Sequence, residues 1–145
     1  EPFVQGEVGA FGYVRGVAAG STPLGGGNLL AAAEIQGYDG PWDLHEDLHR
    51  IAGLVKYSGG GSAAAGGTEY SVQLNGYDSR WTSTDQVPER AVESGRIGRF
   101  GFIDPDLGGS TTRIGAVANA ALGETRLNAF ATYYNFQLTS NFTYF

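Results

Sequence analysis

The stretch Ser110–Leu138 reads STTRIGAVANAALGETRLNAFATYYNFQL, and most of it alternates between apolar and polar residues. Successive side chains of a β-strand point to opposite faces of a sheet, so this alternation predicts strands with one apolar and one polar face. Gly123 and Glu124 follow the first segment and predict a tight hairpin turn. We therefore expect two antiparallel strands, Ser110–Leu122 and Thr125–Leu138.

The same alternation recurs along the chain and predicts an all-β fold, an antiparallel meander of about six long strands. The four earlier strands are expected at Phe3–Ala19, Asn28–Tyr38, His49–Ser58 and Thr68–Tyr77. Their apolar faces carry Val4, Val8, Ala10, Val14 and Ala18; Leu29, Ala31, Ala33 and Ile35; Ile51, Val55 and Tyr57; and Tyr70, Val72 and Leu74. The fifth strand presents Ile114, Ala116, Ala118 and Leu122. In the sixth we expect Phe130, Tyr134, Phe136 and Leu138 on the apolar face, with Ala129, Ala131, Tyr133, Asn135 and Gln137 opposite.

The connections between these strands alternate in length. Short turns are expected at Gly20–Gly27, Gly59–Gly67 and Gly123–Glu124, and longer segments at Asp39–Leu48 and Asp78–Gly109. Outer-membrane barrels have short periplasmic turns and longer extracellular loops, so the two longer segments are predicted to be extracellular.

Two short helices are expected within the longer connections. Leu44–His49 can form one helical turn, with Asp43 as its N-cap and Glu46 completing a capping box. Pro88–Ser94 can form another, because proline suits a first helical turn and Gly95 suits a helix end.

Composition excludes several classes of function. The net charge of −6 disfavours a nucleic-acid partner. The chain has no Cys and no apolar run near the ~20 residues of a membrane helix. No nucleophile elbow or phosphate-binding loop occurs, so we predict no enzyme activity and no cofactor.

Two architectures fit the alternation. In a transmembrane β-barrel the apolar face meets lipid, whereas in a soluble β-sandwich it forms the core. Several segments reach ten residues or more, against about 5–6 for an average globular strand, and this favours part of a larger transmembrane barrel. The alternative is a soluble or surface-exposed β-sheet module that binds a ligand through its long loop.

Several segments resemble the early barrel strands and loops of TonB-dependent outer-membrane receptors. They are YDGPWD at 38–43, KYSGG at 56–60, DQVPERAV at 85–92, GRFG at 98–101, IDP at 103–105 and SNFTYF at 140–145. The resemblance implies that residues 1–145 are a partial barrel domain, a fragment without the family's plug. It also implies location in the bacterial outer membrane, contact with its lipid, and uptake of a scarce nutrient such as an iron–siderophore complex. The TonB complex would act through the absent plug.

Candidate site residues fall into two groups. Aromatic loop residues can hold a ligand, so ligand contacts are predicted for Trp42, Trp81, Phe100 and the neighbouring Arg99, with packing between loops as the alternative. Polar residues of the other strand face are predicted to line the lumen: Glu7, Arg15, Glu34, Gln36, Lys56, Gln73, Asn75, Arg113 and Asn119. Charges of this face, Arg50 included, are expected to pair across strands rather than line a solute path. His45 and His49 are four residues apart, but two histidines without a third ligand predict no metal site.

The number of strands also predicts that the sheet stays open. Six strands in sequence leave two edges, and closing them would give a barrel below the usual minimum of eight strands. We therefore expect an open sheet that closes only by pairing with further strands.

Overall fold

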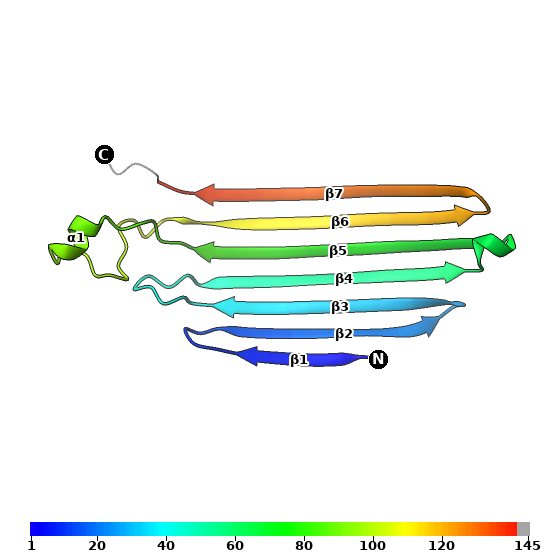
Figure 1. Cartoon of the computed structure of the whole chain (residues 1–145), viewed down its shortest axis with the longest axis horizontal. Coiled ribbons are helices and arrows are strands. Elements are labelled where there is room, and N and C mark those ends of the chain that lie inside the picture. The colour runs from blue at the N-terminus through cyan, green and yellow to red at the C-terminus, as the bar shows by residue number, and fades with distance from the viewer. Residues whose placement is uncertain (142–145) are drawn as a thin grey trace.

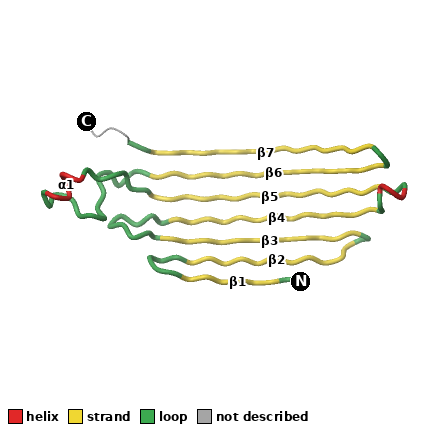
Figure 2. The backbone as a smooth tube through the Cα atoms, viewed as in Figure 1, coloured by secondary structure: helices red, strands yellow, loops and turns green. Residues whose placement is uncertain are grey.

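The computed structural model describes residues 1–141, which form one antiparallel sheet of seven strands in sequence order (Figures 1 and 2). The strands are β1 (Phe3–Val8), β2 (Val14–Leu24), β3 (Gly27–Tyr38), β4 (Leu48–Gly60), β5 (Thr68–Thr82), β6 (Gly108–Leu122) and β7 (Thr125–Thr139). A 3-10 helix, Ala63–Ala65, and α1, Glu89–Glu93, lie in connections. The expected all-β meander is confirmed. Of the SNFTYF segment, residues 142–145 lie outside the described residues.

The prediction of one strand at Phe3–Ala19 is wrong, because this segment contains β1, a turn and the first part of β2. Phe11 and Gly12 adopt left-handed φ angles of 57° and 71°, and the Gly9 N–H donates to the Tyr13 carbonyl at 2.9 Å. The turn has an odd number of residues, so Val8 and Val14 face each other on the same side of the sheet. The period-two pattern therefore runs through the turn without a break.

Other boundaries also differ from expectation. The expected turn Gly20–Gly27 shrinks to Gly25 and Gly26, which have positive φ angles of 56° and 81°. The expected helical turn at Leu44–His49 is absent. The backbone of this segment forms other hydrogen bonds: the Glu46 N–H donates to the Asp39 carbonyl, and the Glu46 carbonyl accepts from the Thr82 N–H.

The long connection is shorter than expected, since β5 continues to Thr82 and leaves 83–107 between β5 and β6. The short helix within it is confirmed as α1, and Gly95 follows it with a φ of 71°.

Cross-strand register defines an apolar face. One row of directly opposed residues is Val4, Ala18, Ala33, Gly53, Gly76, Ile114 and Tyr133. The opposite face, here called the polar face, carries all the polar residues predicted to line the lumen. Register thus confirms that they share one side of the sheet.

The predicted phase of the last strand is wrong. Ala118 opposes Ala129 and Ile114 opposes Tyr133, which places Ala129, Ala131, Tyr133, Asn135 and Gln137 on the apolar face. Phe130, Tyr134, Phe136 and Leu138 lie on the polar face. The cause is the two-residue turn: because Leu122 pairs with Thr125, every later partner in β7 is fixed.

The sheet is a single layer. Among the described residues, Leu107 is the one buried hydrophobic side chain, while Val4 and Val8 on the apolar face are 85% and 86% exposed. β1 and β7 each have a strand neighbour on one side in the described sheet, so the sheet is open, as expected from the number of strands.

Among residues 1–141, no helix is long and apolar enough to cross a membrane.

The connections divide between the two ends of the sheet. The 9–13 turn, the 39–47 loop and the 83–107 loop with α1 lie at one end, here called the loop end (Figure 1). Backbone hydrogen bonds tie these loops together. The Asp39 N–H donates to the Phe11 carbonyl at 3.0 Å, and the Asp43 N–H donates to the Phe100 carbonyl at 2.9 Å.

The phase of β7 can be tested with paired cysteines, since the chain has none of its own. The double variant Ala118→Cys, Ala129→Cys should form a disulfide on mild oxidation, because these residues oppose each other on one face. The control Ala118→Cys, Phe130→Cys points its thiols to opposite faces and should stay reduced. Preferential oxidation of the control, measured by thiol titration, contradicts the register.

The free edges give a second prediction. The 145-residue chain alone should give no compact, heat-sensitive monomer band on a semi-native gel, because its edge N–H and C=O groups cannot be satisfied in lipid without closure. A compact band that converts to a slower one on boiling would show that the chain closes on itself.

Candidate functional site

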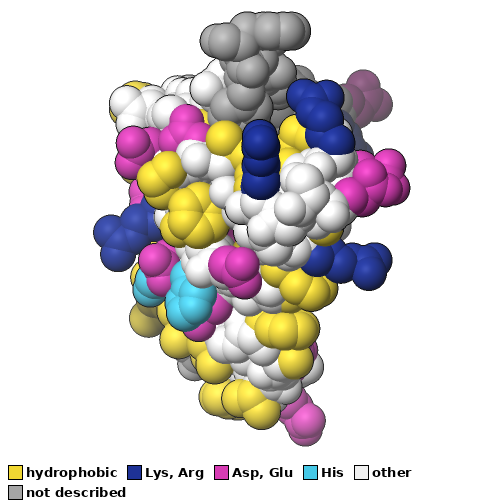
Figure 3. Space-filling view, turned by 90° about the vertical axis from the view of Figure 1, so that its left-hand side faces the viewer, with side chains coloured by type: hydrophobic (Ala, Val, Ile, Leu, Met, Phe, Trp, Pro, Cys, Tyr) yellow, Lys and Arg dark blue, Asp and Glu magenta, His cyan; other side chains and the backbone are white. Residues whose placement is uncertain are grey.

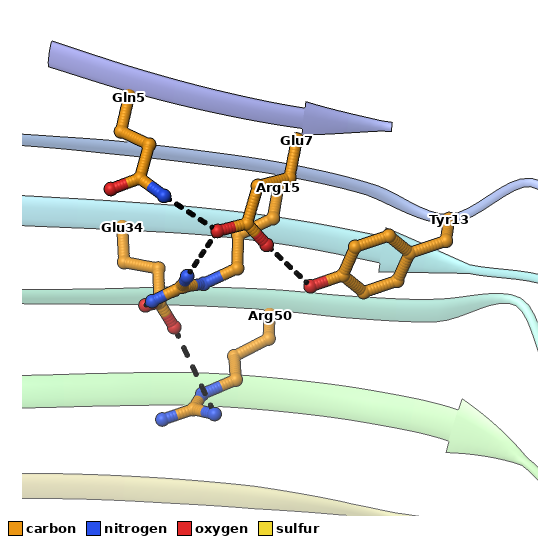
Figure 4. Close-up of polar contacts among 6 residues, drawn as sticks. All are labelled: Gln5, Glu7, Tyr13, Arg15, Glu34 and Arg50. Carbon is orange, nitrogen blue, oxygen red and sulfur yellow. Dashed lines mark hydrogen bonds and ion pairs between the residues drawn. The ribbon is translucent and has the colours of Figure 1, made fainter. Parts of the chain in front are cut away.

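The polar face near the loop end contains a network of charges centred on Arg15 of β2 (Figure 4). The Arg15 Nε and Nη2 atoms donate to Glu34 Oε2 on β3 at 3.0 and 2.5 Å. Its Nη1 donates to Glu7 Oε1 on β1 at 3.1 Å. Both ends of this guanidinium are therefore engaged, and it links three adjacent strands.

The network extends in both directions. Gln5 Nε2 donates to Glu7 Oε1 at 2.8 Å, and the Tyr13 hydroxyl donates to Glu7 Oε2 at 3.2 Å. On the other side, Arg50 Nη1 of β4 lies 3.8 Å from Glu34 Oε1.

The rings of Tyr77 and Tyr38 flank this network. The Arg50 guanidinium lies 5.9 Å from the centre of the Tyr77 ring of β5, within the range of a cation–π contact. The Tyr13 ring lies edge-on to Tyr38, with centroids 6.2 Å apart.

Charges in the network alternate in sign across β1 to β4. The expected cross-strand pairing is confirmed for Glu7, Arg15, Glu34 and Arg50. Lys56 and Arg113 form no ion pair within residues 1–141. The side chain of Arg15 is 31% exposed and that of Glu34 is 20% exposed, so water screens these pairs and each contributes modestly to stability.

Tyr13 sits in the 9–13 turn at the edge of the network. Partial burial, and next its hydrogen bond to Glu7, raises the pKa of the Tyr13 hydroxyl above its usual value of 10. The hydroxyl therefore stays protonated near neutral pH and remains a donor to the Glu7 carboxylate.

A row of aromatic side chains lies on the same polar face at β5 and β7, and sequence reasoning missed its β7 members. The ring centroids of Trp81 and Phe136 are 6.4 Å apart. Those of Phe136 and Tyr134 are also 6.4 Å apart, and these two rings are nearly parallel. Gly109 makes room for the indole, because a Cβ there would lie 2.8 Å from the Trp81 ring. The signal that could have found these residues is the two-residue turn at Gly123–Glu124.

The residues predicted to contact a ligand do not form one cluster. Trp42 and Phe100 pack with their centroids 6.0 Å apart, and the Trp42 indole N–H donates to Glu46 Oε1 at 2.9 Å. Trp81 instead belongs to the aromatic row on the strands. Arg99 is exposed and has no ion pair in the described part of the chain. The Trp42–Phe100 contact is the loop-to-loop packing that was the alternative explanation for these aromatics.

The two histidines do not share a helical face. His49 is the second residue of β4, and its Nδ1 lies 2.7 Å from the Asp47 carbonyl oxygen. His45 stays in the 39–47 loop, where its imidazole gathers with the carboxylates of Asp39 and Asp47. The helical face that His45 and His49 could have shared is absent, because the backbone of this loop is not helical.

No protein-family model, curated protein or solved structure matches this chain.

The network yields a prediction for Glu34, which binds both Arg15 and Arg50. The Glu34→Gln variant should lower the free energy of unfolding by about 1 kcal/mol, because the neutral amide leaves Arg50 without its counter-charge and Arg15 with Glu7 alone. Urea unfolding in detergent, followed by Trp fluorescence, measures the change.

Glu69→Gln is the matched control, since Glu69 lies on the same face, accepts a hydrogen bond from the Ala63 N–H at 3.4 Å and forms no ion pair with the described residues. It should change stability by less than about 0.5 kcal/mol. High salt should narrow the difference between the two variants. Equal effects of the two substitutions would show that the network adds no stability.

Proposed function

We propose that this chain forms part of the wall of a transmembrane β-barrel in the bacterial outer membrane. The observation that carries the proposal is a single-layer sheet with an uncovered apolar face. Water solvates such a face poorly, whereas lipid covers the outer face of a barrel. A sandwich core would require a second layer, and the described strands all lie in one sheet.

The boundary of the apolar face supports this proposal, because it runs diagonally across the strands. The row nearest the loops reads Val8, Val14, Gly37, His49, Arg80, Ser110 and Gln137. The next row reads Gly6, Gly16, Ile35, Ile51, Asp78, Thr112 and Asn135, and the third is the row from Val4 to Tyr133 given above. Read from β1 to β7, the first polar residue is His49 on β4 in the first row and Asp78 on β5 in the second row. The third row contains no charged or amide side chain.

The slope of this boundary matches tilted strands. The apolar side chain nearest the loops is Val14 on β2 and Ile114 on β6. Between these two strands the limit of apolar side chains moves about four residues, roughly 13 Å along the strands, over a width of roughly 19 Å across them. The resulting angle is about 35°, within the tilt of about 35–45° that barrel strands adopt relative to the membrane normal. A level lipid boundary would cross tilted strands along such a diagonal.

The polar face supports a water-filled lumen. Its ion pairs remain partly exposed, and charged groups of this kind are costly in hydrocarbon but stable in water. The aromatic row from Trp81 to Tyr134 lies beside them near the loop end, where a solute that enters from outside first meets the wall.

Together with the sequence resemblance, these features support a role as part of a TonB-dependent receptor. In this role the chain transports rather than catalyses, and its cargo is a scarce nutrient such as an iron–siderophore complex. Its partners are outer-membrane lipid and, through a plug, the TonB complex. The loop end faces the outside of the cell.

Neighbouring cysteines on opposite faces test which face meets lipid. Leu74→Cys and Val55→Cys lie on the apolar face, and Gln73→Cys and Lys56→Cys are their matched controls on the polar face. Each single-cysteine variant is labelled with a small fluorophore in micelles doped with a spin-labelled fatty acid. Labels on the apolar face should be quenched at least about twofold more by the spin label, and the controls more by aqueous iodide.

Equal quenching of the two faces would contradict the barrel. A monodisperse chain without detergent, with both faces open to iodide, would instead support a soluble ligand-binding module.

A further inference from the structure

The 39–47 loop brings together three side chains that can ligate a metal ion. The imidazole of His45 and the carboxylates of Asp39 and Asp47 each offer a ligand atom, and these atoms all lie within 4.8 Å of one another. No hydrogen bond or ion pair engages these three side chains within residues 1–141. We propose that Asp39, His45 and Asp47 bind a divalent transition-metal ion, with Zn²⁺ as the reference ion.

The backbone holds the two ends of this loop together. The Glu46 N–H donates to the Asp39 carbonyl at 2.7 Å, which places the first and last ligands beside each other. The Asp39 N–H is held by the Phe11 carbonyl, and the Thr82 N–H holds the Glu46 carbonyl at 2.6 Å. The 9–13 turn and the end of β5 thus fix both ends of the loop, and little further ordering is needed for binding.

The side chain of Glu46 is excluded from the ligand set. Its Oε1 accepts the Trp42 indole N–H at 2.9 Å. Gly40, with a φ of 74°, makes space for that carboxylate, because a Cβ there would lie 2.8 Å from Oε1. The carboxylate of Glu46 therefore points toward Trp42, and the carboxylates of Asp39 and Asp47 lie near His45.

Electrostatics at this place favours a cation. The segment 39–47 contains four acidic residues and no Lys or Arg. All ion pairs of the described residues involve Arg15 and Arg50 on the polar face of the sheet, so none neutralises Asp39 or Asp47. Figure 3 shows acidic side chains beside the two histidines on the exposed loop end, with a basic side chain next to this group. A bound dication would relieve the repulsion between the two carboxylates.

The donor set selects the class of ion. One imidazole nitrogen and two carboxylate oxygens suit Zn²⁺ or Co²⁺, with water or an incoming ligand in the remaining positions. Ca²⁺ takes six to eight oxygen ligands and Mg²⁺ demands near-ideal octahedral geometry, so both should bind more weakly. The site stands on the loop alone and does not depend on the proposed role in the outer membrane.

Titration calorimetry with Zn²⁺ on the full chain in detergent tests the site, supported by the visible spectrum of Co²⁺. We expect one Zn²⁺ per chain and no comparable heat with Ca²⁺. His45→Asn and Asp47→Asn should each weaken Zn²⁺ binding by more than about tenfold, because each removes one of three protein ligands. Asp43→Asn is the control, since this acid lies in the same loop outside the ligand set and should leave affinity within about twofold.

Circular dichroism of each variant shows whether the strands are retained. Loss of Zn²⁺ binding in Asp43→Asn to the same extent, or full binding in His45→Asn, would overturn the assignment. Equal binding of Ca²⁺ and Zn²⁺ would also overturn it, because a generic acidic surface does not discriminate between these ions.

Discussion

The antiparallel register is the constraint on which the rest of this structure depends. Consecutive strands pair antiparallel, and where a short turn closes the hairpin, that turn fixes the face of every residue in the following strand. Seven strands therefore keep most of their small and branched residues on one side and most of their charges on the other, with Asp78 and Arg80 near the loop end as charged residues of the apolar face. A slip of one residue at any turn would exchange the faces of all strands beyond it.

This separation of faces produces two environments from one layer. On the apolar side, side chains such as Val4 and Ile35 remain exposed because no second layer covers them. On the polar side, Glu7, Arg15, Glu34 and Arg50 bind each other across four strands while keeping contact with water. In the proposed membrane-spanning wall these two faces would meet lipid and water, and the diagonal boundary between apolar and polar residues is the one expected for tilted strands.

The loop end has a different character from the strands, because its order comes from contacts between loops. Backbone bonds join the 9–13 turn to the 39–47 loop, and the 39–47 loop to the segment around Phe100. Trp42 packs on Phe100 and donates its indole N–H to Glu46, so two residues predicted to contact a ligand serve to fix the loop. Within the 39–47 loop, the bond from the Glu46 N–H to the Asp39 carbonyl brings Asp39 close to Asp47, so the proposed metal site is built from residues that carry no motif.

The sequence by itself determined the all-β class, the meander order, the alternation of short and long connections, and the side on which Glu34, Lys56 and Asn119 lie. These features follow from period-two alternation, which is a local property of the chain. The phase of β7 was also contained in the sequence, since the two-residue turn at Gly123–Glu124 fixes it. Counting apolar aromatics such as Phe136 pointed to the wrong face, because a polar face can also carry aromatic rings.

Only the tertiary structure decided the rest. The turn at Phe11 and Gly12 has an odd length that preserves the parity of the pattern, so the extra strand appears only once the chain folds back. The grouping of Asp39, His45 and Asp47 depends on backbone hydrogen bonds to Phe11 and Thr82, which are distant in sequence. Local patterns specify the face of a strand, whereas contacts between loops depend on which ends of the strands the sheet brings together.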